Sequence, residues 1–335
     1  MTLLPQDSTA CYEVSKASSV VDHANNFKDL EGGVYYSLAA NEPFNGVLRD
    51  YSVGDTLRAS VESLSAASLE YVGYIGPEWV LVSQIFGDED FLINGRLING
   101  EAIYISSGKV AHSISRSAST TNMLLVEKKR FFDSFNVRNP AIRECLPFEL
   151  FLRPSDGTAA DLRVLFSRLF GELDREPAQS DMPTKYLEKI LTTVSDIVGD
   201  DGRSDAASMS SATRAYIVDK SCELFAQHFG DESFGIVDLC ERLRVSRRTL
   251  QYSFETIIGM SPSAYMRSVR LNIARQSIMT KPGESIQGSA MDAGFGHLGR
   301  FSKYYLDFFG ELPSATVSKA RGFASTDGRP TANAA

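Results

Sequence analysis

Two side chains in the last third of the chain carry the hydrogen-bonding groups that read DNA bases. Arg248 has the paired donors that match guanine, and Gln251 has the donor and acceptor that match adenine. Ser246 is a natural N-cap, so a helix is expected to begin after it. If Leu250 faces the core, a step of about 100° per residue turns Arg248 and Gln251 outward. The same rotation turns Tyr252 and Glu255 outward and Ser246, Arg247, Phe254 and Ile257 toward the core. The alternative is that Arg248 and Gln251 are ordinary solvated residues on the exposed face of a helix.

The segment that contains these residues occurs twice. Residues 236–258 and 287–309 align at an interval of 51 positions. The matched pairs are Leu250 with Phe301, Phe254 with Tyr305, Gly259 with Gly310, Pro262 with Pro313, and Ser263 with Ser314. Each copy passes from a short apolar helix through a tight turn into a second helix, the element that enters a DNA major groove. Two copies predict a chain that contacts two successive major grooves of double-stranded DNA.

The second copy carries fewer donors than the first. Its expected parts are the N-cap Ser285, a helix over 286–292, a turn over 293–296 and a second helix from near His297. Phe301 and Tyr305 are expected in the core, which leaves Gly299, Ser302, Lys303 and Leu306 outward. Arg300 and Lys303 can meet phosphates, and Leu298 can touch a thymine methyl. We therefore expect the first copy to supply base discrimination and the second to supply affinity.

A helix over residues 264–275 is expected to join the two copies. Met266, Val269, Ile273 and Ala274 would form its core side. Gly259 and Gly310 are expected to end the two reading helices. A stiff connector would fix the separation of those helices, which must be about 34 Å for one protein face to reach both grooves.

The N-terminal part has a different pattern, which predicts β structure from residue 30 to about residue 130. Runs of aromatic and β-branched residues at 71–75, 79–82 and 102–105 predict strands. Asn94-Gly95 is the favoured two-residue hairpin signal, and Asn99-Gly100 offers another turn. Frequent turns favour an antiparallel β-sandwich or barrel of cupin-like type.

Two amphipathic helices are expected after the strands. Apolar residues recur at helical spacing over 162–173 and 187–198, and Pro177 and Pro183 bracket the break between them. We favour packing of the apolar faces on the sheet of the same domain, and a dimer interface is the alternative.

These patterns divide the chain into four parts. They are a β-rich sensor and dimerisation domain over 1–198, a linker over 199–211, an all-α DNA-binding domain over 212–322 and a disordered tail over 323–335. The net charge of −8 is unevenly distributed. Residues 214–322 hold 14 Lys and Arg against 11 Asp and Glu, whereas the remainder holds 20 against 31. This asymmetry fits a DNA-facing domain attached to an acidic one.

Residues 230–322 resemble the AraC/XylS family of bacterial regulators. The resemblance is carried by residues 245–251 (VSRRTLQ), 259–262 (GMSP), 294–296 (GFG) and 309–314 (FGELPS). It implies two helix-turn-helix units on a long helix, with DNA contacts from Arg247, Arg248, Gln251, Tyr252, Leu298, Gly299 and Lys303. Gly299 departs from the polar residue usual at its position. Residues 297–313 are most similar to the branch that contains the ethanolamine-utilisation regulator, which residues 22–24 and 44–46 also resemble.

Nothing in the sequence indicates catalysis. A metal site in a cupin-like domain needs clustered histidines with a carboxylate. Of His23, His112, His228 and His297, only His112 lies among the predicted strands. The motifs of serine hydrolases, zinc proteases and P-loop proteins are absent, and no G-x-G-x-x-G of the dinucleotide-binding type follows a predicted strand. We expect no enzyme, no metal and no cofactor.

The interior of the β-domain is instead expected to bind a small-molecule effector. Candidate residues are Tyr35, Tyr36, Trp79, Arg96 and Tyr104, with core packing as the alternative for each aromatic. The chain is expected to be a cytoplasmic, nucleoid-associated homodimer that activates transcription with RNA polymerase and contacts no membrane. Two alternatives stay open: an N-terminal module for oligomerisation or protein interaction without a ligand, and a cupin-type metalloenzyme with an appended DNA-binding module.

Overall fold

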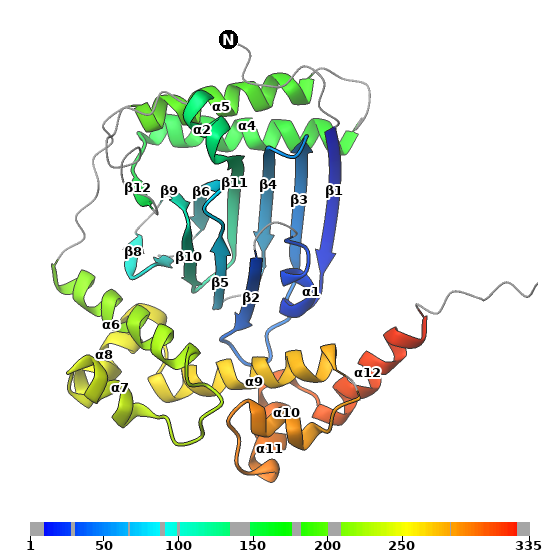
Figure 1. The fold of residues 1–335 in the computed structure, drawn as a ribbon, viewed down its shortest axis with the longest axis vertical. Coiled ribbons are helices and arrows are strands. Elements are labelled where there is room, and N and C mark those ends of the chain that lie inside the picture. The colour runs from blue at the N-terminus through cyan, green and yellow to red at the C-terminus, as the bar shows by residue number, and fades with distance from the viewer. Residues whose placement is uncertain are drawn as a thin grey trace, which may run out of the picture. The chain divides into compact units, whose positions relative to one another are not determined.

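The computed structural model describes residues 10–27, 31–65, 68–87, 91–98, 101–134, 148–175, 182–199, 209–281 and 283–326. These residues form two compact units. The first unit holds residues 1–35 and 43–213, and the second holds residues 36–42 and 214–335. Figure 1 labels the elements of both. No helix of the described residues is long and apolar enough to cross a membrane.

The first unit is built from two antiparallel sheets, which confirms the predicted architecture. The larger sheet has the order β1 (Ala10–Ala17), β3 (Gly46–Val53), β4 (Leu57–Leu64), β11 (Ser119–Glu127), β6 (Trp79–Gly87), β9 (Ala102–Ser107) and β12 (Phe148–Leu152). The smaller has the order β2 (Glu31–Ser37), β5 (Leu69–Ile75), β10 (Lys109–Ser115), β7 (Phe91–Ile93) and β8 (Arg96–Ile98). β1 and β12 lie outside the range predicted to be β, because as edge strands they lack a long apolar run. Short helices α1 (Val20–Ala24) and α2 (Lys128–Ser134) complete the β region.

The predicted hairpin at Asn94-Gly95 joins β7 to β8. Asn94 has φ of 42° and Gly95 has φ of 75°, the left-handed pair that a two-residue turn of the favoured type requires. The Asn94 side chain also accepts from the His112 backbone N–H at 2.7 Å, which ties the turn to β10. The second expected turn, Asn99-Gly100, lies outside the described residues.

Two helices cover one face of the larger sheet. α4 (Asp156–Arg175) and α5 (Met182–Gly199) lie side by side (Figure 1) and bury the predicted apolar stripes. Leu169, Leu187 and Ile190 are fully buried, and they belong to one cluster with Val80 and Val126 of the sheet. Packing within the domain therefore accounts for these stripes. Pro183 lies in the first turn of α5 rather than in the break, since proline is tolerated there, and Pro177 lies outside the described residues.

The second unit is helical and matches the predicted order. Its helices are α6 (Met209–Ala226), α7 (Ile236–Leu243), α8 (Arg247–Ile258), α9 (Pro262–Thr280), α10 (Ile286–Asp292), α11 (Leu298–Phe309) and α12 (Pro313–Thr326). Gly259 and Gly310 take left-handed φ values of 75° and 70° and end α8 and α11 as predicted. The connector α9 begins at Pro262 after the N-cap Ser261 and is longer than the expected segment. Its expected core residues Met266, Val269 and Ala274 are buried, and Ile273 is half-buried.

The second unit also includes seven residues from the first part of the chain, 36–42. The Asn272 side chain accepts from Ser37 N–H at 3.1 Å and donates to Ser37 C=O at 2.7 Å. Asn41 donates from its backbone to Phe308 C=O at 2.7 Å, and Leu38 is 3% exposed. The helical unit is therefore discontinuous in sequence.

Helix ends differ from the expected domain boundaries. α5 continues through Gly199 and α6 begins at Met209, so helix occupies both ends of the expected linker, whose residues 200–208 lie outside the described residues. α12 ends at Thr326, inside the expected tail. Helices anchored by buried residues such as Val198 and Ala215 propagate into polar segments whose composition alone suggested loops.

Candidate DNA-binding surface and ligand pocket

The first helix-turn-helix is closed by a left-handed residue and a serine cap. Arg244 has φ of 54° and ψ of 42° and ends α7, while Val245 N–H donates to Cys240 C=O at 3.0 Å. Ser246 Oγ then accepts from Thr249 N–H at 3.0 Å, as its predicted role as N-cap requires. These local bonds fix the direction in which α8 leaves the turn.

The polar residues of α8 point away from the core. Leu250 and Phe254 are fully buried, whereas Arg248 is exposed and Tyr252 is 56% exposed. Arg247 was expected near the core but is exposed, because it is the first residue of the helix and precedes the buried turn of Leu250. Arg247 and Arg248 therefore add two exposed cations to the same end of the helix.

Two contacts order the outward side chains of α8. The Gln251 amide donates to Glu255 Oε1 at 2.6 Å, so one of its donors is engaged within the helix. The Arg214 guanidinium lies 5.3 Å from the centre of the Tyr252 ring. Arg214 was not among the sequence candidates, and only its position at the start of the basic segment could have suggested it.

The second helix-turn-helix has a longer turn. Ser285 Oγ accepts from Gly288 N–H at 3.0 Å, Gly294 takes φ of 81°, and Phe295 N–H donates to Ala290 C=O at 2.9 Å. The first helices of the two units begin 50 positions apart, at Ile236 and Ile286, and the second helices begin 51 apart, at Arg247 and Leu298. The interval predicted for the whole repeat thus holds only from the second helices onward. The turn has two additional residues in the second unit (293–297 against 244–246), and the first helix of that unit is one residue shorter.

α11 presents a different outward face. Phe301 and Tyr305 are fully buried as predicted, and Arg300 and Lys303 are exposed. Leu298 and Leu306 are each 42% exposed. A side chain at Gly299 would meet no atom within 4 Å, so packing does not require glycine there.

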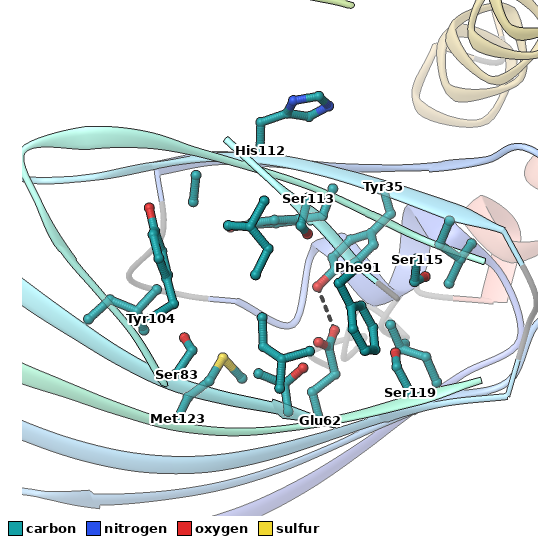
Figure 2. A pocket seen from close by; sticks show the side chains of 18 of the residues that line it. Tyr35, Glu62, Ser83, Phe91, Tyr104, His112, Ser113, Ser115, Ser119 and Met123 are labelled. Atoms are coloured by element: carbon teal, nitrogen blue, oxygen red, sulfur yellow. Dashed lines mark hydrogen bonds between the residues drawn. The ribbon is translucent and has the colours of Figure 1, made fainter. Parts of the chain in front are cut away.

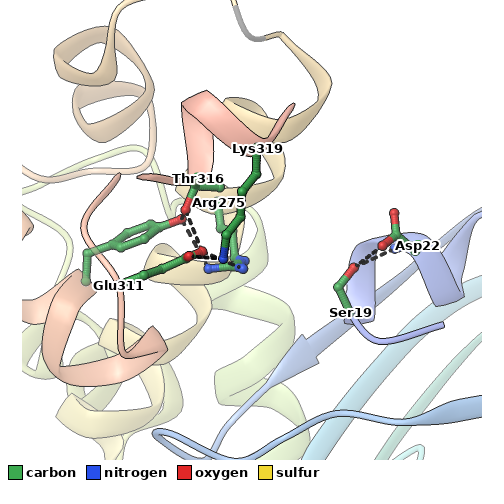
Figure 3. Close-up of polar contacts among 7 residues, drawn as sticks. Ser19, Asp22, Arg275, Glu311, Thr316 and Lys319 are labelled. Carbon is green, nitrogen blue, oxygen red and sulfur yellow. Dashed lines mark hydrogen bonds and ion pairs between the residues drawn. The ribbon is translucent and has the colours of Figure 1, made fainter. Parts of the chain in front are cut away.

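Polar contacts hold α9 to the segments that flank the two units. Arg270 donates to Phe229 C=O at 3.0 Å and to Asp231 C=O at 2.8 Å. Burial lowers the pKa of Arg270, and the nearby charges of Asp231 and Glu232 oppose that shift. At the other end, the Arg275 guanidinium lies 3.0 Å from the Glu311 carboxylate, which also accepts from Thr316 and Lys319 (Figure 3). Within the units themselves, Arg275 donates to the Tyr305 hydroxyl of α11 at 3.4 Å, and the ring centres of Phe254 in α8 and Tyr265 in α9 are 5.5 Å apart. The connector therefore contacts both helix-turn-helix units.

A pocket with a cavity volume of about 80 Å³ lies between the two sheets of the first unit and is partly open to solvent. Side chains alternate along each strand, so β6 turns Val80 and Val82 toward the helices and Leu81, Ser83 and Ile85 toward the pocket. Figure 2 shows Ser83, Met123 and Glu62 on one side and Tyr35 and Ser113 on the other. The His112 ring points away from this group, and its Nε2 lies 2.9 Å from Glu70 Oε1.

A buried carboxylate lies at one end of the pocket. Glu62 is 6% exposed, and its Oε1 accepts from the Tyr35 hydroxyl and lies 2.8 Å from His23 Nε2. A side chain at Gly46 would lie 2.5 Å from His23 Nδ1, so glycine permits this packing. The two N-terminal segments that resemble the regulator branch, 22–24 and 44–46, therefore meet at His23. Sequence reasoning missed Glu62 and His23 because 39 residues separate them.

The structure brings together two of the five candidate effector residues. Tyr35 and Tyr104 line the pocket. Trp79 packs at the edge of a cluster with Leu81 and Leu125. Tyr36 belongs to the second unit, and Arg96 is exposed with its guanidinium 4.8 Å from the Phe151 ring centre.

Residues 239–319 match the family model described as a helix-turn-helix domain. The XylDLEGF operon transcriptional activator 2 of Pseudomonas putida is 40% identical over 88 residues, which cover 26% of this chain and 56% of that protein. The HTH-type transcriptional regulator ArgR of Pseudomonas aeruginosa is 34% identical over 85 residues, 25% of this chain and 26% of ArgR. The structure of the AraC-like transcriptional activator CuxR has a TM-score of 0.38 and 13% identity, and the match covers 84% of this chain and 100% of CuxR.

The matched segments span from about a quarter to about half of these curated relatives. Fold and match together define residues 239–319 as a helix-turn-helix domain. With two such units on one connecting helix, and with its similarity to the XylDLEGF activators, this domain belongs to the AraC/XylS family.

Proposed function

We propose that the protein is a transcription activator that binds two successive major grooves through α8 and α11. The observation that carries the proposal is the pair of exposed helix faces in the second unit, each fixed through its buried face and each packed against α9. A major groove admits such a helix, and a rigid connector holds two of them in register with the DNA.

The two helices have different roles in this proposal. Arg247, Arg248, Gln251 and Tyr252 of α8 contact bases and the adjacent backbone, with Arg248 and Gln251 as the base-reading pair. Leu298, Gly299, Arg300 and Lys303 of α11 lie against the second groove, where the two cations meet phosphates. One Gln251 N–H donates to Glu255, and the second N–H and the carbonyl oxygen are the donor and acceptor that adenine requires.

The proposal extends to three further partners. The pocket between the sheets binds a small-molecule effector, a second copy of the chain forms a homodimer, and RNA polymerase is recruited at the promoter. The pocket supports the first of these, since a mostly apolar wall with a few polar groups is usual for a small-molecule site. Sedimentation at micromolar concentration tests the homodimer, and a strictly monomeric chain on DNA would contradict it.

Selection of the full chain on random DNA, followed by footprinting of the enriched sequence, tests DNA binding. We expect protection along one face over about two helical turns and affinity that falls steeply with salt. The matched control replaces Arg247 and Arg248 by Ala, with folding checked by circular dichroism. A folded wild-type chain that enriches no sequence would overturn the proposal.

Thermal unfolding of the full chain with candidate ligands tests the effector. A ligand at 100 times its Kd stabilises the protein by about 2.7 kcal/mol, whereas a module that binds only protein shows no such shift. A promoter reporter that the chain does not activate in the presence of a bound ligand would contradict effector control.

A further inference from the structure

The pocket between the sheets contains one end that differs chemically from the rest. Most of its wall is apolar or carries small hydroxyls, as at Ser83 and Ser119. Glu62 is the acidic residue among the described lining residues, and they include no Lys or Arg. A buried carboxylate without a cation in the same wall is costly unless another group neutralises it.

The contacts of Glu62 leave part of its carboxylate unused. Both hydrogen-bonding neighbours, Tyr35 and His23, approach the same oxygen, Oε1. Oε2 accepts no hydrogen bond from the described residues. Tyr35 stays a neutral donor, since burial and then the charge of Glu62 raise its pKa well above the usual range.

His23 contacts Glu62 through one ring nitrogen, Nε2. His23 is fully buried, and its Nδ1 has no hydrogen-bond partner among the described residues. An imidazolium would bury an N–H there without an acceptor, whereas a neutral ring with its proton on Nε2 donates to Glu62 and leaves only a lone pair. Glu62 thus shares Oε1 between this ring and the Tyr35 hydroxyl and keeps Oε2 for a group of a ligand.

Three aromatic rings surround the same end of the pocket. The ring centres of Tyr35 and Tyr71 are 4.8 Å apart, those of Phe27 and Tyr35 are 6.0 Å apart, and those of Phe27 and Tyr71 are 6.4 Å apart. All three residues line the pocket together with Glu62. Aromatic faces grouped around a carboxylate attract organic cations, which gain both the ring quadrupole and the charge.

Tyr71 offers an additional unused group. Its hydroxyl is buried and has no hydrogen-bond partner among the described residues. The hydroxyl lies over Gly73 on the same strand, where an added side chain would come within 2.0 Å of it. Glycine at 73 thus leaves room for the hydroxyl beside the acidic end, where it can pair with a polar group of a ligand.

We propose that the effector pocket binds a small organic cation, an amine with an apolar or aromatic body, whose ammonium group meets Glu62 between the rings of Phe27, Tyr35 and Tyr71. The inference rests on the proposed effector function and specifies its ligand class. An anionic ligand would bring its charge toward Glu62 with no lysine or arginine in the described wall to compensate.

Calorimetry of the full chain with matched ligand series tests this assignment. The probes are benzylamine, phenethylamine and cyclohexylamine, each compared with the alcohol and the carboxylate of the same skeleton. At least one amine is expected to bind about tenfold or more tighter than its alcohol, as cation–aromatic attraction and a buried charge imply, and the carboxylates are expected not to bind. A series in which no amine binds, or in which an alcohol or carboxylate binds as tightly as its amine, overturns the proposal.

Two variants test whether amine binding depends on Glu62. Glu62→Gln keeps an oxygen that accepts from Tyr35 but removes the charge, so the preference for amine over alcohol should disappear. Ser119→Ala changes another part of the wall and should leave the preference intact. DNA footprinting of each variant without ligand verifies the fold. Normal footprints without amine binding would refute only the ligand class, whereas amine binding without any footprint would refute the proposed function.

Discussion

The two helix-turn-helix units share an architecture but make their turns differently. Arg244 occupies the left-handed position in the first unit, and Gly294 occupies it in the second. The N-cap of the following helix comes two residues later in the first unit, at Ser246, and three later in the second, at His297. The Ser246 side chain caps its helix, whereas His297 makes no side-chain cap. A duplicated motif thus keeps its buried positions while the turn and the outward face diverge.

The outward faces of the two reading helices also differ, and again the first unit has more hydrogen-bonding side chains. α8 carries Arg248 and Gln251, which match base edges, and α11 carries Arg300 and Lys303 beside two exposed leucines. The proposed function accordingly gives discrimination to the first copy of the motif and affinity to the second. The variants below test the division of roles, the way each turn is held, and the contacts of Glu311 after the second unit.

Gly294→Ala should have the largest effect. A side chain at this position would lie 2.4 Å from Phe229 C=O at a φ of 81°, so both a backbone clash and conformational strain oppose it. We expect a loss of about 2–4 kcal/mol in the free energy of unfolding, measured by urea titration. Gly299→Ala in the same unit, where an added side chain meets nothing, is the control and should cost nothing. Equal losses in both would show that the turn is not specially constrained.

Arg248→Ala should impair the first unit selectively. Removing a guanidinium that pairs with a base costs about 1–3 kcal/mol and relaxes preference at one operator position. Binding to a set of operators with single base changes measures this. A uniform loss on all sequences would assign Arg248 to the backbone instead.

Lys303→Ala should impair the second unit without changing specificity. Loss of one phosphate contact weakens binding to all sequences similarly and lowers the slope of log affinity against log salt by about one. A salt titration on specific and random DNA provides the measurement. If Lys303→Ala and Arg248→Ala behaved alike, the proposed division between the two helices would be wrong.

Glu311→Gln should make the stability of the second unit less sensitive to acid. Burial raises the pKa of Glu311, but hydrogen bonds from Lys319 and Thr316 and the charge of Arg275 outweigh it, so the net shift is downward. A lowered pKa in the folded state contributes stability above the ordinary glutamate pKa of about 4.5, and this is lost as pH falls through the folded value. The difference in unfolding free energy between wild type and variant should therefore be present at pH 7 and shrink in acid. Glu284→Gln removes an exposed pair with Lys281 and is the control; the same pH response in both would rule out this cause.

Arg244→Gly should have the smallest effect, a gain of stability. Glycine adopts a φ of 54° without the strain of a side chain, although it also adds freedom to the unfolded chain, so about 0.5–1 kcal/mol is expected. Arg244→Ala is the control, because it removes the charge of the side chain but keeps the strain of a left-handed φ. A melting temperature that rises equally in both would attribute the gain to charge.

Local signals made the second unit predictable. Ser246 and Ser285 precede apolar helices, and Gly259 and Gly310 follow the two reading helices, so caps and ends can be read from neighbouring residues. The hairpin at Asn94-Gly95 is equally local. Such signals act over a few residues and do not depend on the remainder of the fold.

The pocket could be predicted only in part, because it depends on contacts between distant residues. Tyr35 and Tyr104 were candidates from their type, but Glu62 gains its role from His23 and the opposite sheet. Trp79 has the same strand parity as Leu81 and Ser83, yet it lies at the strand end and does not line the pocket. The alternation of side chains along a strand predicts which face of the sheet each one occupies. It does not predict which residues of the opposing sheet they meet.

The discontinuity of the second unit has a consequence for the order of biosynthesis. Ser37 and its partner Asn272 are 235 residues apart, so at about 5–20 residues per second the ribosome delivers Asn272 roughly 10 to 50 s after Ser37. Until then Leu38 and its neighbours cannot take the places on α9 that they occupy in the finished unit. An expressed C-terminal fragment, or a chimera cut at residue 213, would leave the amide of Asn272 without Ser37 even when every DNA-contacting helix is retained.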